Sequence, residues 1–366
     1  MIEVADIFRQ HGAAYQADHA LLPSQQRAIR DILNCRTEFF GGHVAQCDHC
    51  GHLRYAYHSC RNRHCPKCHG EQAEDWLERQ RSLLLPVPHF LLTFTLPSEL
   101  RTLAFAHQKD VYGALLRCAA QSVLKLTADP RWLGATPTVL AVLHTWTRAM
   151  LFHPHVHLLV SAGGLTADGQ RWLPAKNPAF LAPVRALSVI FRAKMRDALK
   201  ADALLDEAPA RVWRKPWVVH SQHAGSGAKV LEYLARYVFR VAITNSRIEA
   251  FERGQVTFRY RDNRTQQLRH VCVPAEEFIQ RFLHHVLPRG FPKVRHYGLA
   301  STARAQDRQR ALRLQTRDRA PSAPGPSSKP STGALPAVES LPVCPRCHHG
   351  HLQVIQTLRP RRKFPP

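Results

Sequence analysis

The sequence has few acidic residues and no long hydrophobic run. Asp and Glu number 27 among 366 residues, against 51 Lys and Arg, which gives a formal net charge of +24. No stretch reaches the roughly 18–20 uncharged apolar residues of a membrane-spanning helix, which excludes a helical membrane protein. The beginning of the chain also lacks the basic and then apolar layout of a secretory signal, so we expect a cytoplasmic protein.

The sequence does contain enough apolar residues for a buried core, and a large excess of positive charge. Residues of the hydrophobic types make up 45% of the chain, a fraction typical of globular proteins. A strongly basic surface attracts polyanions, because phosphates release condensed counterions when cationic side chains bind them. The composition therefore favours a nucleic-acid-binding protein and argues against a membrane partner.

The cysteines occur mostly as close pairs. Cys47 and Cys50 form one C-x-x-C pair and Cys65 and Cys68 another, with fourteen residues between them. Two thiolate pairs on tight turns can complete a tetrahedral Zn²⁺ site, so we expect these four cysteines to bind structural zinc. Cys60 is a fifth thiol in this stretch. It either replaces one of the four or belongs to a second, incomplete site.

A third pair, Cys344 and Cys347, lies near the end of the chain and forms half of a zinc site. A neighbouring histidine could complete this site, or its ligands could come from elsewhere in the chain. The pair alone leaves these alternatives open.

The order of the sequence patterns predicts an α+β fold with several segments. Apolar runs alternate with amphipathic helical patterns between residues 86 and 300, with strands expected over 212–221 and 241–249 among others. The expected segments are a helical and zinc-binding domain (1–85), the α+β domain (86–300), a basic helical extension (301–319), a disordered linker (320–342) and a tail with a C-x-x-C pair (343–366).

Three histidines alternate within the strand-like segment FHPHVHLLVSA (152–162). His153, His155 and His157 would point to one face of a strand, about 7 Å apart, where two imidazoles can share a divalent cation. His153 and, on the preceding strand, His144 are candidates for a third ligand. Either could instead be a structural histidine, and that role is favoured for His144.

Two tyrosines follow in a helical pattern. Tyr233 and Tyr237 are four residues apart, which places both phenols on one helix face, with Arg236 and Arg240 beside them. A phenolate can attack a phosphodiester once cations neutralise the phosphate. Ordinary half-buried packing would give the same spacing, so the pattern alone does not establish a nucleophile.

Five segments, in this order, resemble the transposases of the insertion-sequence-91 family, which are two-tyrosine HUH (His-hydrophobic-His) endonucleases. They are LTFTLP (92–97), LAVLHTW (140–146), HPHVHLLVSAGGL (153–165), YLARYVFRVAITNSRI (233–248) and FPKVRHYGLAS (291–301). SCRNRHCPKC (59–68) is similar to the zinc-binding domain found at the N-terminus of that family.

The resemblance implies an HUH-type antiparallel sheet flanked by helices, and rolling-circle-like transposition through single-stranded DNA. It assigns His155 and His157 as ligands of a catalytic Mg²⁺ or Mn²⁺, and Tyr233 and Tyr237 as nucleophiles that form 5′-phosphotyrosine. The phosphotyrosine conserves the bond energy, so no nucleotide cofactor is needed. Relatives with one active tyrosine exist, so the two tyrosines need not contribute equally, and Tyr237 is ranked slightly ahead of Tyr233.

Basic side chains near these motifs are candidate DNA contacts. Cations interleaved with aromatic residues suit single-stranded DNA, whose bases stack and whose phosphates pair with positive charge. The candidates are Arg61, Arg63, Lys67, Arg236, Arg240, Lys293 and Arg295.

Two other functions share most of these features. A non-catalytic zinc-dependent DNA-binding protein, such as a regulator or an inactivated transposase, would have the same charge and cysteines. A plasmid relaxase or replication initiator would share the histidines and tyrosines. The motifs around His144 and Tyr297 favour the transposase.

Overall fold

The computed structural model describes residues 1–68, 70–177, 181–239, 242–262, 264–317 and 341–361. The chain divides into two compact units. The central unit contains Met1–Ile2 and His69–Arg319, and the terminal unit joins Glu3–Cys68 to Ala320–Pro366. The C-terminal tail, expected as a separate segment, belongs with the N-terminal residues because its strand pairs with theirs. Residues 320–340 of the expected linker lie outside the described residues.

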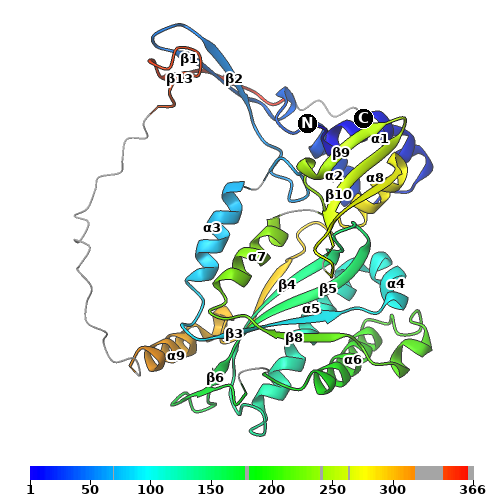
Figure 1. The fold of residues 1–366 in the computed structure, drawn as a ribbon, viewed down its shortest axis with the longest axis vertical. Coiled ribbons are helices and arrows are strands. Elements are labelled where there is room, and N and C mark those ends of the chain that lie inside the picture. Colours follow the sequence, from blue (N-terminus) through cyan, green and yellow to red (C-terminus); the bar gives the residue numbers. More distant parts are fainter. Residues whose placement is uncertain (69, 178–180, 240–241, 263, 318–340, 362–366) are drawn as a thin grey trace. The chain divides into compact units, whose positions relative to one another are not determined.

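The central unit is built on one five-stranded sheet in which all neighbouring strands are antiparallel (Figure 1). The strand order is β12 (Val294–Gly298), β4 (Thr138–Trp146), β5 (Phe152–Ser161), β3 (His89–Thr95) and β8 (Val219–His223). This sheet and its helices confirm the α+β class.

One face of the sheet is covered by α5 (Gln108–Ala128) and α6 (Val184–Ala201). Phe94 of β3 is fully buried there and meets Phe191 of α6 edge to face, with ring centroids 5.0 Å apart. Even-numbered residues of β5, such as Leu158, point to this face, because side chains alternate along a strand. This face holds the largest apolar cluster among the described residues.

The other face is covered by α7 (Ala228–Phe239), which lies beside α3 (Gly70–Arg81) (Figure 1). Leu231 and Leu234 of α7 pack on Leu140 and Leu159 of the sheet. The amphipathic helix is therefore fixed by its apolar stripe. By its contacts α3 belongs to this unit, so the N-terminal part of the compact terminal unit ends at Cys68.

Two expected strands are displaced. Within 212–221 only the end is a strand, β8, because Ala210–Arg214 form a 3₁₀ turn and Pro216 cannot donate a ladder hydrogen bond. Within 241–249 a 3₁₀ turn at Asn245–Arg247 delays the strand to β9 (Ile248–Glu252).

The remaining elements of the central unit pack around its edges. β9, β10 (Gln255–Arg261) and β11 (Leu268–Pro274) form an antiparallel sheet under α8 (Ala275–Leu283), and β6 (Gly163–Leu165) pairs with β7 (Trp172–Pro174). α4 (Arg101–Ala106) precedes α5. The basic segment 301–319 contains α9 (Ala305–Arg317), whose Ala311 is buried beside Leu165 and Leu299.

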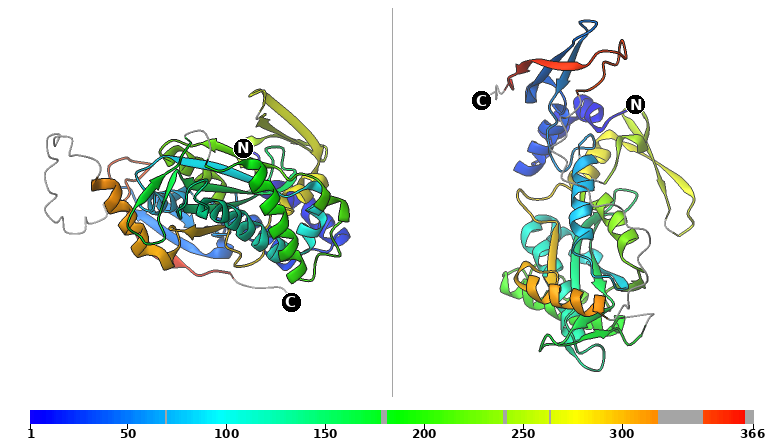
Figure 2. Two further views of the ribbon diagram at one scale, coloured as in Figure 1. Left: turned by 90° about the horizontal axis from the view of Figure 1, so that it is seen from below. Right: turned by 90° about the vertical axis from the view of Figure 1, so that its left-hand side faces the viewer.

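The terminal unit combines two helices with a small sheet. α1 (Val4–Asp18) and α2 (Pro23–Leu33) bury apolar residues that follow helical spacing, among them Ile7, Phe8 and Ile29. The sheet is antiparallel in the order β13 (Leu352–Leu358), β1 (Gly42–Cys47) and β2 (Leu53–Tyr57). Figure 2 shows the red C-terminal strand alongside the blue N-terminal hairpin. Across both units, none of the described helices has the length and hydropathy needed to cross a membrane.

Candidate active site and metal centres

Three histidines of the central sheet converge on the face that α7 covers. The register of β4 and β5 places His144 directly opposite His155 and Val142 opposite His157. The ring centroid of His144 lies 5.0 Å from that of His155 and 4.5 Å from that of His157. One ring nitrogen from each histidine lies within 4.8 Å of the others, a spacing that one metal ion can bridge. We call these three residues the histidine trio.

The third member of the trio is His144, for which the sequence favours a structural role, and not the other candidate, His153. His153 accepts a hydrogen bond at Nδ1 from Arg101, with Nη2 2.8 Å away. Ring distance does not separate the two candidates, because the ring centroid of His153 lies 5.2 Å from that of His155. The group of ring nitrogens within 4.8 Å of one another includes His144 and does not include His153. In the sequence, the short connection between HTW and HPH indicates that these two segments pair as neighbouring strands. That pairing places His144 opposite His155.

Hydrogen bonds orient the trio for metal binding. Nδ1 of His155 donates to the carbonyl of His153 over 2.7 Å, which leaves Nε2 as the lone-pair nitrogen. Nδ1 of His157 lies 3.0 Å from the hydroxyl of Thr93 on β3. Such partners fix the tautomer and ring direction of metal-binding histidines. Thr93 is a supporting residue that the sequence analysis did not identify.

Burial keeps the trio neutral. Desolvation lowers the pKa of His155 to about 4 and that of His157 to about 3, and it holds the pKa of His144 well below its ordinary value. Neutral imidazoles with available lone pairs are the form that binds a divalent cation. The three nitrogen donors therefore fit a metal ion. Because these ligands are neutral, they would not cancel the positive charge of that ion.

Tyr233 lies beside the trio. It is half-buried on α7, and its ring centroid is 6.1 Å from that of His157. The helix begins after a turn at Gly227, whose φ of +79° favours glycine and where an added Cβ atom would lie only 3.1 Å from the His89 ring. The backbone of Tyr237 lies one turn further along α7, but its side chain, like those of Arg236 and Arg240, lies outside the described residues.

The cysteines assemble into two clusters, and neither is the expected set. Cys65 and Cys68 join Cys35 and Cys60, whereas Cys47 and Cys50 join Cys344 and Cys347. The reason is the β1–β2 hairpin. Cys47 and Cys50 lie at its turn, while Cys35 and Cys60 flank its open end, about 17–20 Å away at ~3.3 Å per strand residue.

The first of these clusters has the dimensions of a zinc site. Sγ of Cys68 lies 3.6 Å from Sγ of Cys35 and 3.6 Å from Sγ of Cys60. Four Zn–S bonds of about 2.3 Å in a tetrahedron separate the sulfur atoms by about 3.8 Å. These four thiols therefore fit Zn²⁺, with Cys35 as a ligand that the sequence analysis did not include.

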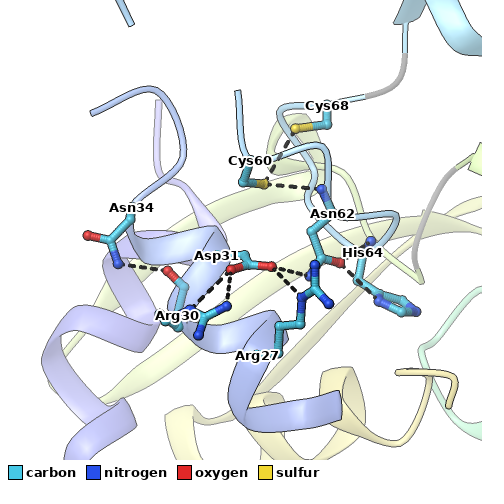
Figure 3. Close-up of polar contacts among 8 residues, drawn as sticks. All are labelled: Arg27, Arg30, Asp31, Asn34, Cys60, Asn62, His64 and Cys68. Atoms are coloured by element: carbon cyan, nitrogen blue, oxygen red, sulfur yellow. Dashed lines mark hydrogen bonds and ion pairs between the residues drawn. The ribbon is translucent and has the colours of Figure 1, made fainter. Parts of the chain in front are cut away.

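A buried carboxylate on α2 supports the first cluster (Figure 3). Asp31 accepts hydrogen bonds from Nδ2 of Asn62 and Nη2 of Arg30, each over 2.9 Å. The backbone N–H of Asn62 in turn donates to Sγ of Cys60 over 3.4 Å, and its Oδ1 accepts from the backbone N–H of His64. The helix thereby positions the loop that carries the thiols.

Comparison with known proteins identifies the family. The family described as "Putative transposase" matches residues 138–308, and the "Transposase zinc-binding domain" matches residues 7–96. A protein of Sinorhizobium fredii named "Putative transposase y4qJ" is 39% identical, covering 97% of this chain and 95% of its own length. The chain belongs to the insertion-sequence-91 family of transposases.

A second relative supports the same family. The "Transposase for insertion sequence element IS801" of Pseudomonas savastanoi pv. phaseolicola is 30% identical over 74% of this chain and 68% of its own length. No solved structure matches the chain. As a member of this transposase family, the protein is a DNA-processing enzyme of an insertion element that binds DNA and carries a zinc-binding domain.

The expected DNA contacts of the transposase domain lie on different faces. The ammonium of Lys293 lies 4.5 Å over the ring of Trp146, which stacks on His144 of the trio. Arg295 pairs with Ala141 and points to the opposite face, where its guanidinium lies 5.5 Å over Phe291. There it lines a pocket of about 420 Å³ together with Lys109, Arg117 and Arg289.

The expected DNA contacts of the zinc-binding domain also differ in exposure. Arg61 is exposed, but Arg63 is half-buried, and burial lowers its pKa. Lys67 is paired with Glu3, with Nζ 2.5 Å from the carboxylate. Of these three cations, Arg61 is the best placed to meet phosphate.

Proposed function

We propose that this transposase cuts and rejoins single-stranded DNA at the ends of its element through 5′-phosphotyrosine intermediates, in a rolling-circle-like mechanism. The observation that carries the proposal is the 6.1 Å separation between the rings of Tyr233 and His157, a member of the buried trio. A nucleophile and a metal-ligand cluster at this distance can act on the same phosphate group.

We assign His144, His155 and His157 as the residues that hold a catalytic Mg²⁺ or Mn²⁺. A bound divalent cation supplies positive charge that polarises the scissile phosphate. Lys293 adds a second positive charge beside Trp146 and His144, where it can pair with a phosphate oxygen. The buried sheet holds the trio rigid, so the phosphate would be positioned before the reaction begins.

In this mechanism the Tyr233 hydroxyl loses its proton and its oxygen attacks phosphorus in line with the bond to the 3′ oxygen. That bond breaks, the 3′ oxygen takes up a proton, and the 5′ phosphate stays on tyrosine. Attack by another 3′-hydroxyl reverses the step and frees the tyrosine. One ester replaces another, so no nucleotide cofactor is consumed. Tyr237, one turn later on α7, would serve the second strand.

A covalent-adduct assay tests the proposal. The full chain is incubated with labelled single-stranded DNA carrying an element end and with Mn²⁺ or Mg²⁺, and the products are separated on a denaturing gel. We expect a protein-linked band that needs the metal and disappears when Tyr233→Phe and Tyr237→Phe are combined. Tyr55→Phe, at an exposed tyrosine of β2, is the matched control and should keep the band.

The assay also separates the alternative functions. Binding of the element end without any adduct would favour a regulator or an inactivated transposase. Adducts formed on a plasmid origin but not on element ends would favour a relaxase or replication initiator. An adduct that survives in the double tyrosine variant would contradict the proposed nucleophiles.

A further inference from the structure

The second cysteine cluster joins two turns from opposite ends of the chain. β13 pairs with β1 so that Leu352 lies opposite Cys47, and an isolated bridge between Val343 and His351 closes the C-terminal turn. This pairing brings residues 344–350 beside the β1–β2 turn, almost 300 positions earlier in the sequence. Neither matched family region includes Cys344 or Cys347.

The thiols of this cluster lie at metal-site distances. Sγ of Cys47 is 3.7 Å from Sγ of Cys347, and Sγ of Cys50 is 3.8 Å from Sγ of Cys344. A tetrahedron with Zn–S bonds of about 2.3 Å requires about 3.8 Å between sulfurs, whereas a disulfide requires about 2.05 Å. The four sulfurs all lie within 4.8 Å of one another, so their arrangement is that of a four-ligand site rather than of two crosslinks.

The backbone of both turns is directed at sulfur. The N–H of Cys50 donates to Sγ of Cys47, and the N–H of Gly350 donates to Sγ of Cys347, each over 3.4 Å. Hydrogen bonds of this kind stabilise thiolates, which are the form that binds zinc. The two turns therefore present equivalent pairs of ligands.

The contact between the turns leaves no room for a side chain at Gly350. A Cβ atom there would lie 2.6 Å from Sγ of Cys47 and 2.6 Å from a carboxylate oxygen of Asp48. Asp48 also accepts a hydrogen bond from the backbone N–H of His351 over 2.8 Å. The turns thus fit each other closely around the sulfur atoms.

Apolar burial is too small to hold the C-terminal strand in place. The only cluster of buried residues described at this junction consists of Ala45, Leu352 and cysteines. Val354 and Ile355 of β13 are 61% and 55% exposed. A small sheet with so little apolar burial generally depends on a metal or a crosslink for stability.

We propose that Cys47, Cys50, Cys344 and Cys347 form a second structural zinc site, separate from the Cys35 cluster, which fastens the C-terminal tail to the N-terminal zinc-binding domain. The zinc-binding domain is then discontinuous in sequence. Its fold requires both ends of the chain, and the site does not depend on the catalytic mechanism proposed above.

Zinc content of the purified full chain tests this site, with His144→Ala present in every sample so that the histidine trio adds no zinc of its own. Inductively coupled plasma mass spectrometry should find two zinc ions per chain, and one in the variant that combines Cys344→Ser with Cys347→Ser. Cys272→Ser, at an exposed cysteine of β11, is the matched control and should keep two. One zinc in the chain that keeps all its cysteines, or two in the double variant, would overturn the proposal.

A variant that alters no ligand gives an independent test. Gly350→Ala should also reduce the zinc content to one, because the added Cβ would collide with Sγ of Cys47. Hydrogen exchange should then show loss of amide protection in residues 352–358, with protection in β4 and β5 unchanged. Full protection of residues 352–358 in a chain that has lost one zinc would mean that the metal does not fasten the tail.

Discussion

The two units of this transposase are stabilised in different ways. The central unit buries a large apolar cluster between its sheet and α5 and α6, and its histidine trio is attached to that rigid sheet. The terminal unit places two four-cysteine clusters around a three-stranded sheet with few buried apolar residues. The histidine trio thus depends on packing for its position, whereas the zinc sites proposed here would hold the three-stranded sheet of the terminal unit.

Metal removal should have the largest effect, and it should act on the terminal unit alone. Structural zinc binding by cysteines is worth about 10–16 kcal/mol, so a chelator should unfold the sheet formed by β13, β1 and β2. We expect hydrogen exchange to show loss of protection in residues 42–57 and 352–358, while β3, β4 and β5 stay protected. Protection that survives complete zinc removal would show that packing alone holds the terminal sheet.

Replacement of a trio histidine should affect activity and leave the central fold in place. His144→Ala should lower metal-dependent DNA cleavage at least ~1,000-fold, because several kcal/mol of charge stabilisation depend on the bound metal. His153→Ala should lower it less than tenfold, since His153 is engaged with Arg101. Single-turnover cleavage rates measure both. The reverse ranking would restore His153 as the third ligand.

A substitution in the apolar cluster should act on the stability of the central unit alone. Phe94→Ala removes a fully buried ring that contacts Phe191, and it should cost about 3–5 kcal/mol of unfolding free energy. Denaturant unfolding monitored for the central unit gives this value, while the zinc content should remain at two. Loss of zinc in this variant would show that the units are not stabilised independently.

The smallest expected effect concerns the support of the first zinc cluster. Asn62→Ala removes the side-chain hydrogen bonds to Asp31 and His64 but no ligand, and it should weaken zinc binding about 10–100-fold. Competition with a chromophoric chelator measures the affinity. Arg61→Ala, at the exposed neighbouring cation, is the matched control and should leave the affinity unchanged.

The sequence predicted those features that depend on local pattern. The alternation of side chains predicted the strand that carries His155 and His157, and the helical spacing of apolar residues predicted the helix that carries Tyr233. Each of these repeats can be seen within a single segment of the sequence. The types of zinc ligand were also predictable from the paired cysteines.

Features that depend on distant pairing were not predictable in the same way. The role of His144 depends on the register between β4 and β5, which a single strand does not specify. The grouping of the cysteines depends on which end of the β1–β2 hairpin each one occupies. The partnership of Cys47 with Cys347 further requires β13 to pair with β1, a contact that no local sequence signal specifies.

The most direct test of the central claim is to locate the DNA adduct on the chain. Trypsin cleaves after Lys229, Arg236 and Arg240, so Tyr233 and Tyr237 fall in separate peptides, 230–236 and 237–240. After reaction with an element end and nuclease digestion, mass spectrometry should find a nucleotide phosphate on one or both of these peptides. Cleaved DNA with an adduct on any other residue, or with no adduct at all, would contradict tyrosine strand transfer at the histidine trio.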